Sequence, residues 1–140
     1  MIDFFDTSAL AKRYLREPGS REVTRALARG HCAVARIAYA ELLAAAARAC
    51  REGLIDEDAR DRIFASALAD FRDLTVVEIR ASTLQAIPEL VRRHPLRGYD
   101  AVQLACALAL RRVGPAVRFW AADATLRAAA KAEGLRAMAI

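Results

Sequence analysis

The sequence lacks any apolar run long enough to cross a membrane. Its longest nearly apolar stretch, residues 101–110, contains Gln103 and falls far short of the roughly 20 residues that a transmembrane helix needs. The N-terminal residues include Asp3 and Asp6, whereas a secretory signal begins with positive charge. We therefore expect a protein without membrane segments that stays in the cytoplasm.

Cysteine and histidine are scarce as well. The three cysteines, Cys32, Cys50 and Cys106, are odd in number and far apart, and small apolar residues surround them. This is typical of reduced core residues and argues against a disulfide framework or a zinc site. The two histidines, His31 and His94, are too isolated for a histidine-based metal site or catalytic triad. Any metal site must therefore rely on oxygen ligands.

Aromatic residues and lysine are the remaining shortages. Aromatic residues make up 6% of the chain, and alanine supplies much of its 56% hydrophobic content, which favours packed helices over sandwiched sheets. Only Lys12 and Lys131 are lysine, so arginine carries almost all of the positive charge behind the net charge of +5. Arginine matches phosphate oxygens with its planar fork. A genome rich in alanine and arginine codons would give the same composition, so charge alone does not identify a partner.

Segments of strand and helix character alternate along the whole chain. Strands are predicted at residues 2–5, 32–34, 75–79, 117–121 and 136–140, and helices at 9–15, 20–29, 36–51, 55–71, 82–93, 99–112 and 123–133, with a break at Gly114 and Pro115. Pro88 predicts a kink or a late start within the helix at 82–93. The alternation predicts an α/β fold, in which one mostly parallel five-stranded sheet lies between helices. Residues 1–140 should form a single domain.

Two aspartates directly follow or lie close behind predicted strands. Asp6 and Asp123 should therefore meet at one edge of the sheet if their strands are neighbours, because ligands of parallel sheets bind beyond the carboxyl ends of the strands. Thr7 and Ser8 follow Asp6 and could orient a water molecule or a phosphate oxygen. Both aspartates also precede helices, and each could be an ordinary N-cap.

Two further acids stand alone in helices that are otherwise almost entirely apolar. Glu41 and Asp100 are expected in or near the core, where an uncompensated ion costs several kcal/mol. Neither buried stretch offers a close basic partner: Arg48 lies two turns beyond Glu41, and Arg111 lies three turns beyond Asp100. The helix dipole could stabilise Asp100, and a distant arginine could pair with Glu41.

A divalent cation offsets the crowding of carboxylates better than either alternative. Oxygen ligands without cysteine or histidine select Mg²⁺ or Mn²⁺, and such an ion suits the hydrolysis of phosphodiester bonds. The predicted metal ligands and catalytic residues are Asp6, Glu41, Asp100 and Asp123. The basic residues that could guide phosphate groups are Lys12, Arg13, Arg16, Arg92, Arg93 and Arg97, although ordinary surface charge would explain them equally well.

Four short segments resemble the motifs of a known family. They are DTSAL at 6–10, YAEL at 39–42, LRGYDAVQLA at 96–105 and WAAD at 120–123. Their order and spacing resemble the PIN-domain family, and in particular the VapC-type ribonuclease toxins of bacterial toxin–antitoxin pairs. The chain differs where members often carry hydroxyl residues, since it has Ala121 two positions before the last acid and Ala35 six positions before the second.

The resemblance implies a PIN fold with a central parallel sheet and dependence on Mg²⁺ or Mn²⁺. It also implies cleavage of structured RNA, a homodimer and inhibition by a cognate antitoxin. The two alanines motivate a rival hypothesis, in which a domain of this fold binds nucleic acid or another partner with little or no catalysis.

Overall fold

A single five-stranded sheet forms the centre of the computed structural model, which describes residues 1–114 and 116–140. Pro115, in the predicted break, lies outside the described residues. The strands are β1 (Ile2–Phe5), β2 (Cys32–Ala35), β3 (Thr75–Val77), β4 (Val117–Trp120) and β5 (Arg136–Met138). Their order is β3-β2-β1-β4-β5, and each neighbouring pair is parallel. The predicted α/β fold is confirmed, with a sheet that is parallel throughout rather than mostly parallel.

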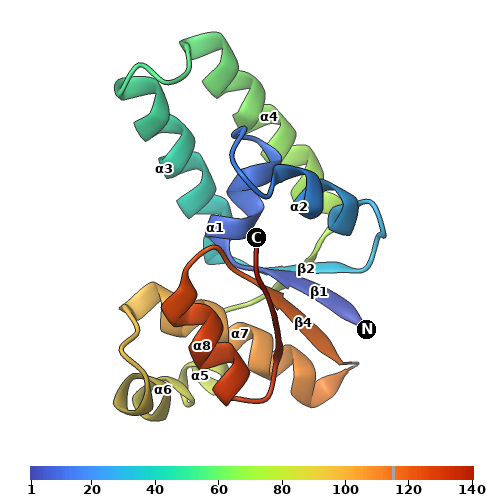
Figure 1. Cartoon of the computed structure of the whole chain (residues 1–140), viewed down its shortest axis with the longest axis vertical. Coiled ribbons are helices and arrows are strands. Elements are labelled where there is room, and N and C mark those ends of the chain that lie inside the picture. Colours follow the sequence, from blue (N-terminus) through green and yellow to red (C-terminus); the bar gives the residue numbers. More distant parts are fainter. Residues whose placement is uncertain (115) are drawn as a thin grey trace.

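Helices cover both faces of this sheet (Figure 1). One face carries α1 (Thr7–Leu10), the short 3₁₀ helix η1 (Ala11–Arg13), α2 (Ser20–Leu27), α3 (Ile37–Arg51) and α4 (Glu57–Asp73). The other face carries α5 (Ala81–Leu84), α6 (Ile87–Arg93), α7 (Gly98–Val113) and α8 (Ala124–Ala132). The three layers follow from the right-handed crossovers that parallel strands require.

The core is divided between the two faces by the alternation of side chains along the strands. Phe4 stacks on Phe119 with ring centroids 5.7 Å apart, and these two rings belong to the cluster beneath α6, α7 and α8. Phe5 stacks on Trp120 at 5.6 Å within the cluster beneath α1 to α4. Neighbouring residues of β1 and β4 therefore fill opposite faces, as the two-residue period of a strand dictates.

Local sequence signals explain the ends of several helices. Asp56 caps α4 by accepting a hydrogen bond from the Ala59 amide at 2.7 Å. Gly53 adopts a φ of 73° just after α3, where a left-handed residue ends the helix. The helix predicted at 82–93 is divided into α5 and α6, with Pro88 in the first turn of α6, so the late start is confirmed.

Two long helices, α3 and α4, extend beyond the sheet. Helices α3 and α4 pack side by side and form a hairpin that projects away from the strands (Figure 1). Within the part of the chain that the structure describes, no helix is both long and apolar enough to span a membrane.

A buried carboxylate, that of Asp3 in β1, links β1 to β4, and the sequence analysis did not predict its burial. Asp3 is 1% exposed and accepts hydrogen bonds from Trp120 Nε1 at 2.7 Å, Arg118 Nη2 at 2.7 Å and Arg29 Nη2 at 3.2 Å. Asp3 and Arg118 face each other in the register of β1 and β4. Because the carboxylate is matched by two guanidinium groups and an indole N–H, its burial is tolerated.

Candidate active site

The four predicted acids lie around one cleft at the carboxyl edge of the sheet. Asp6 follows β1 and Asp123 follows β4, and these strands are neighbours, as the amide of Asp6 donates to the Trp120 carbonyl at 3.0 Å. Glu41 comes from α3 and Asp100 from α7. All four line a cleft of about 720 Å³, together with Thr7 and Ser8. Four elements distant in the sequence thus bring their carboxylates to the same opening.

Asp6 is the most buried of these acids, with 5% of its surface exposed. Its carboxylate accepts hydrogen bonds from the Ala9 amide at 3.0 Å and from the Ser8 hydroxyl at 2.9 Å. Burial raises the pKa of Asp6 to about 6, although the bonds from Ala9 and Ser8 act in the opposite direction, and the charge of Asp100 raises it further. The main cause is the loss of solvation of the charged form on burial.

This raised pKa predicts how the stability of the metal-free protein depends on pH. As the pH rises from about 4 to about 6, the unfolded chain releases the Asp6 proton at its ordinary pKa of 3.8 while the folded protein keeps it. Folding stability is therefore lost over this window, by up to about 3 kcal/mol. Urea unfolding of EDTA-treated protein measures the loss as the difference between the native chain and Asp6→Asn, which lacks this titration. A difference that does not change between pH 4 and pH 7 would show that the assigned pKa is wrong.

Glu41 is held by uncharged donors. Its carboxylate accepts hydrogen bonds from the Thr7 hydroxyl and from Gln103 Nε2, the latter at 2.8 Å. Among the described residues, no arginine or lysine forms an ion pair with Glu41. The alternative hypothesis, that a distant arginine pairs with Glu41, is therefore wrong for the described residues.

Asp100 does have a basic partner, which corrects the expectation from the sequence. Arg97, in the turn just before α7, donates from Nε at 3.2 Å and from its backbone amide at 3.4 Å. Further along the helix itself, the first basic residue is Arg111, three turns beyond Asp100. Asp123 caps α8, since its Oδ1 accepts from the Leu126 amide at 2.7 Å. Asp6 and Asp123 are thus both N-caps, a role that occupies only part of each carboxylate.

The chemistry of this donor set fits a hydrated divalent cation. Within residues 1–114 and 116–140, no three carboxylate, imidazole or thiol groups converge tightly enough to enclose a metal ion by themselves. Mg²⁺ keeps several of its water molecules and needs only one or two direct carboxylate ligands. Oxygen-only ligands spread around a cleft are compatible with that mode, and the crowding of Asp6 and Asp100 would be relieved by it. Arg97 would share the Asp100 carboxylate with such an ion.

Of the six basic residues proposed to guide phosphate, only Arg97 lines the cleft. The others are engaged or placed elsewhere: Lys12 is buried against Glu17 and the Pro18 carbonyl, Arg13 pairs with Asp70, Arg92 with Glu89 and Arg93 with Glu133, and Arg16 lines a separate hollow near α2. The sequence missed two arginines of the cleft, Arg48 and Arg51 at the end of α3. A signal for Arg48 existed, because a spacing of seven residues places it on the same helix face as Glu41.

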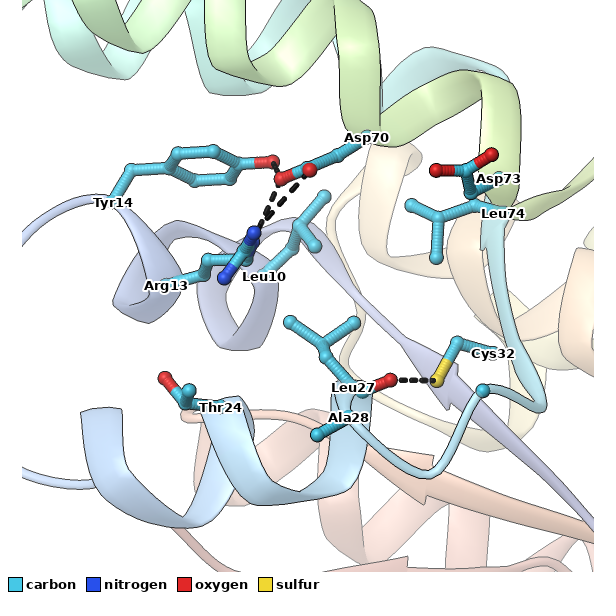
Figure 2. Close-up of a pocket in the computed structure, with 11 residues that line it drawn as sticks. Leu10, Arg13, Tyr14, Thr24, Leu27, Ala28, Cys32, Asp70, Asp73 and Leu74 are labelled. Atoms are coloured by element: carbon cyan, nitrogen blue, oxygen red, sulfur yellow. Dashed lines mark hydrogen bonds and ion pairs between the residues drawn. The ribbon is translucent and has the colours of Figure 1, made fainter.

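A second cavity, of about 400 Å³, lies between η1, α2 and α4 (Figure 2). Asp70 at its rim is already engaged, since it accepts from Arg13 Nε at 2.7 Å and from the Tyr14 hydroxyl at 2.6 Å. Cys32 also lines this cavity, and burial raises the pKa of its thiol to about 11. A carboxylate that is already paired with an arginine and a thiol that stays protonated offer little for catalysis. The acidic cleft is therefore the better candidate.

The comparisons with known proteins agree with this architecture. A family model described as PIN domain matches residues 4–113, a range that contains Asp6, Glu41 and Asp100. The chain belongs to the PIN domain family. Two curated relatives, Ribonuclease VapC45 and Ribonuclease VapC49 of Mycobacterium tuberculosis strains, are each 38% identical over 139 residues, covering 95% of this chain and 92% of the relative.

A solved structure supports the fold independently. A chain of a toxin–antitoxin complex from Klebsiella pneumoniae superposes with a TM-score of 0.64 and covers 86% of both chains. Its sequence identity of 17% means that this likeness shows the fold alone.

The two alanines that depart from the PIN domain pattern are fully buried in this structure. Ala35 ends β2 and Ala121 follows β4, and both are packed into the core. The loop that bears Asp123 is held in another way. Arg127 donates to the Ala121 carbonyl at 2.9 Å, and the Ser8 hydroxyl accepts from the Ala122 amide at 3.0 Å. Ser8 therefore links this loop to Asp6, which it also contacts.

Proposed function

We propose that this PIN domain is a metal-dependent endoribonuclease that hydrolyses RNA phosphodiester bonds. The observation that carries the proposal is the cleft itself, where Asp6, Glu41, Asp100 and Asp123 come together from four separate elements. Glu41 caps no helix and has no basic partner among the described residues, whereas the structural acid Asp3 is matched by two arginines. The ribonuclease names of the curated relatives favour the same reaction.

Each residue has a role that follows from its contacts. Asp6, Glu41 and Asp100 would hold Mg²⁺ or Mn²⁺ directly or through water, and Asp123 would complete the site. Ser8 and Thr7 hold the carboxylates of Asp6 and Glu41 by hydrogen bonds, which is a more specific task than orienting a water molecule or phosphate. A divalent ion bound there supplies Lewis-acid chemistry, since it acidifies a water molecule and neutralises charge on the scissile phosphate.

The basic residues of the cleft suit an RNA backbone. Arg48, Arg51 and Arg97 line the opening that contains the acids, and they would contact phosphates on either side of the cleaved bond. The names of the curated VapC relatives favour a role as the toxin of a toxin–antitoxin pair. We infer that the protein acts on RNA in the cytoplasm as a homodimer and is inhibited by a cognate antitoxin.

Cleavage of labelled RNA by the purified protein tests this proposal. We expect cleavage with Mg²⁺ or Mn²⁺, its loss in EDTA and its recovery when the ion is returned in excess. Binding of RNA without cleavage under all of these conditions would favour the rival function, a binding or interaction module with the same fold. The absence of both binding and cleavage, tested on structured and unstructured RNA, would contradict the ribonuclease and the RNA-binding form of the rival function alike.

A further inference from the structure

Gln103 is a buried polar residue that contacts Glu41 but is not itself one of the proposed metal ligands. It lies on α7 one turn after Asp100, and 2% of its surface is exposed. Its Nε2 atom donates to Glu41 Oε2 at 2.8 Å and to Thr7 Oγ1 at 2.8 Å. Thr7 Oγ1 itself donates to the same carboxylate oxygen. Thr7, Glu41 and Gln103 thus form a closed triangle of hydrogen bonds between α1, α3 and α7.

The donors in this triangle all occupy one oxygen of Glu41. Both hydrogen bonds go to Oε2, and no hydrogen bond reaches Oε1 from the described residues. A carboxylate held through one oxygen keeps its second oxygen free in a fixed direction. We infer that Gln103 is a positioning residue, which holds Glu41 so that this second oxygen serves the cation of the cleft. The inference rests on the proposed function.

The orientation of the Gln103 amide follows from its neighbours. Glu41 Oε2 is an acceptor, and Thr7 Oγ1 has its own proton directed to Glu41, so both atoms facing Gln103 require a donor. The opposite amide orientation would place Oε1 against the carboxylate. The NH₂ group must therefore face Glu41 and Thr7.

The other end of the amide shows that stability alone does not explain this residue. Gln103 Oε1 is buried and has no hydrogen-bond partner within the part of the chain that the structure describes. A buried acceptor without a partner destabilises a fold, and an apolar side chain of similar size would remove that cost. A polar residue that costs stability at a functional site is typical of a trade-off in favour of function.

The triangle also ties together the elements that bear three of the acids. Thr7 is adjacent to Asp6, Glu41 is itself a proposed ligand, and Gln103 is one turn from Asp100. A partner in this position typically changes metal affinity by roughly 10- to 100-fold when it is removed. Loss of Gln103 should therefore weaken metal binding with only a small net effect on the fold, because the two hydrogen bonds from Nε2 are lost while the unpaired Oε1 is removed.

The substitution Gln103→Met tests this directly, with Gln85→Met as its matched control. Gln85 is the only other glutamine, and it is exposed at the end of α5. We expect Gln103→Met to bind Mn²⁺ roughly 10- to 100-fold more weakly in calorimetry. We also expect its kcat for RNA to fall with little change in KM, and its metal-free melting temperature to change little. Gln85→Met should match the native protein in all three measurements.

A double-mutant cycle separates positioning from a general structural effect. If Gln103 acts through Glu41, then Gln103→Met should have little further effect on Mn²⁺ affinity in a Glu41→Gln background. Equal effects in both backgrounds would overturn the inference, as would native Mn²⁺ affinity in Gln103→Met. The proposed function would survive either result. A native protein that neither binds Mn²⁺ nor cleaves RNA would overturn both.

A measurement on the native chain keeps the inference testable if Gln103→Met fails to fold. The chain contains no asparagine and two glutamines, so NMR should show only two side-chain amide groups. The amide signal that remains in Gln85→Met belongs to Gln103. We expect this signal to be present in metal-free buffer, to be protected from exchange and to shift when Mg²⁺ is added. A Gln103 amide that exchanges rapidly, or that does not respond to Mg²⁺, would contradict the inference.

Discussion

Replacing either Asp6 or Asp100 by asparagine is expected to lower the rate of RNA cleavage in Mg²⁺ by about a thousandfold. Metal ions stabilise the developing charge by several kcal/mol, and each 1.36 kcal/mol corresponds to about tenfold in rate. Asparagine keeps the size and hydrogen-bonding shape of aspartate, and it caps helices as well as aspartate does. The fold should therefore survive while the charge is lost. Steady-state cleavage kinetics and melting curves measure the two effects separately.

The matched control for these variants is Asp56→Asn. Asp56 caps α4 through the Ala59 amide at 2.7 Å, much as Asp6 caps α1, but Asp56 is exposed and lies outside the cleft. This variant should cleave RNA at close to the native rate. Native rates in both Asp6→Asn and Asp100→Asn would show that these carboxylates do not form the catalytic site.

The substitution Asp3→Ala is expected to lower the free energy of unfolding by about 3–5 kcal/mol, because it removes one partner of a buried ion pair. Arg118 and the indole N–H of Trp120 would lose the carboxylate that lies 2.7 Å from each of them. Arg29 is half exposed and can turn to water, so it contributes less to this loss. Urea unfolding of the metal-free protein measures the change.

Two controls sharpen this prediction. Asp61→Ala removes the partner of Arg60 in an exposed pair and should leave the stability nearly unchanged. The double variant Asp3→Leu, Arg118→Met removes both buried charges and should recover much of the loss. A small effect of Asp3→Ala, similar to that of Asp61→Ala, would mean that the buried charges contribute little.

Most of the fold follows from local patterns in the sequence. Short apolar segments predict the strands, and signals such as Pro88 and the acidic turn after Asp56 predict where helices begin. The order of the strands does not follow from such signals, because it depends on pairing between segments far apart in the chain. From the sequence alone, the pairing of β1 with β4 could only be assumed, and the structure shows it.

The candidate site shows the same division. Isolation in apolar helices was enough to select Glu41 and Asp100, but their partners could not be identified. Gln103 contacts Glu41 across 62 positions, and Asp3 contacts Arg118 across 115 positions, so no window of sequence contains either pair. Arg97 is an exception, since opposite charges three residues apart at the start of a helix lie close enough to interact.

The central claim is that the acids of the cleft are assembled around a divalent cation. Titration of the metal-free protein with Mn²⁺, followed by calorimetry, tests it most directly. The account predicts measurable binding to the native chain and stabilisation by about 3 kcal/mol when the free ion reaches 100 times its dissociation constant. Both the Mn²⁺ binding and the stabilisation should be lost in the double variant Asp6→Asn, Asp100→Asn. A native chain that releases no heat with Mn²⁺ and keeps the same melting temperature would contradict the account.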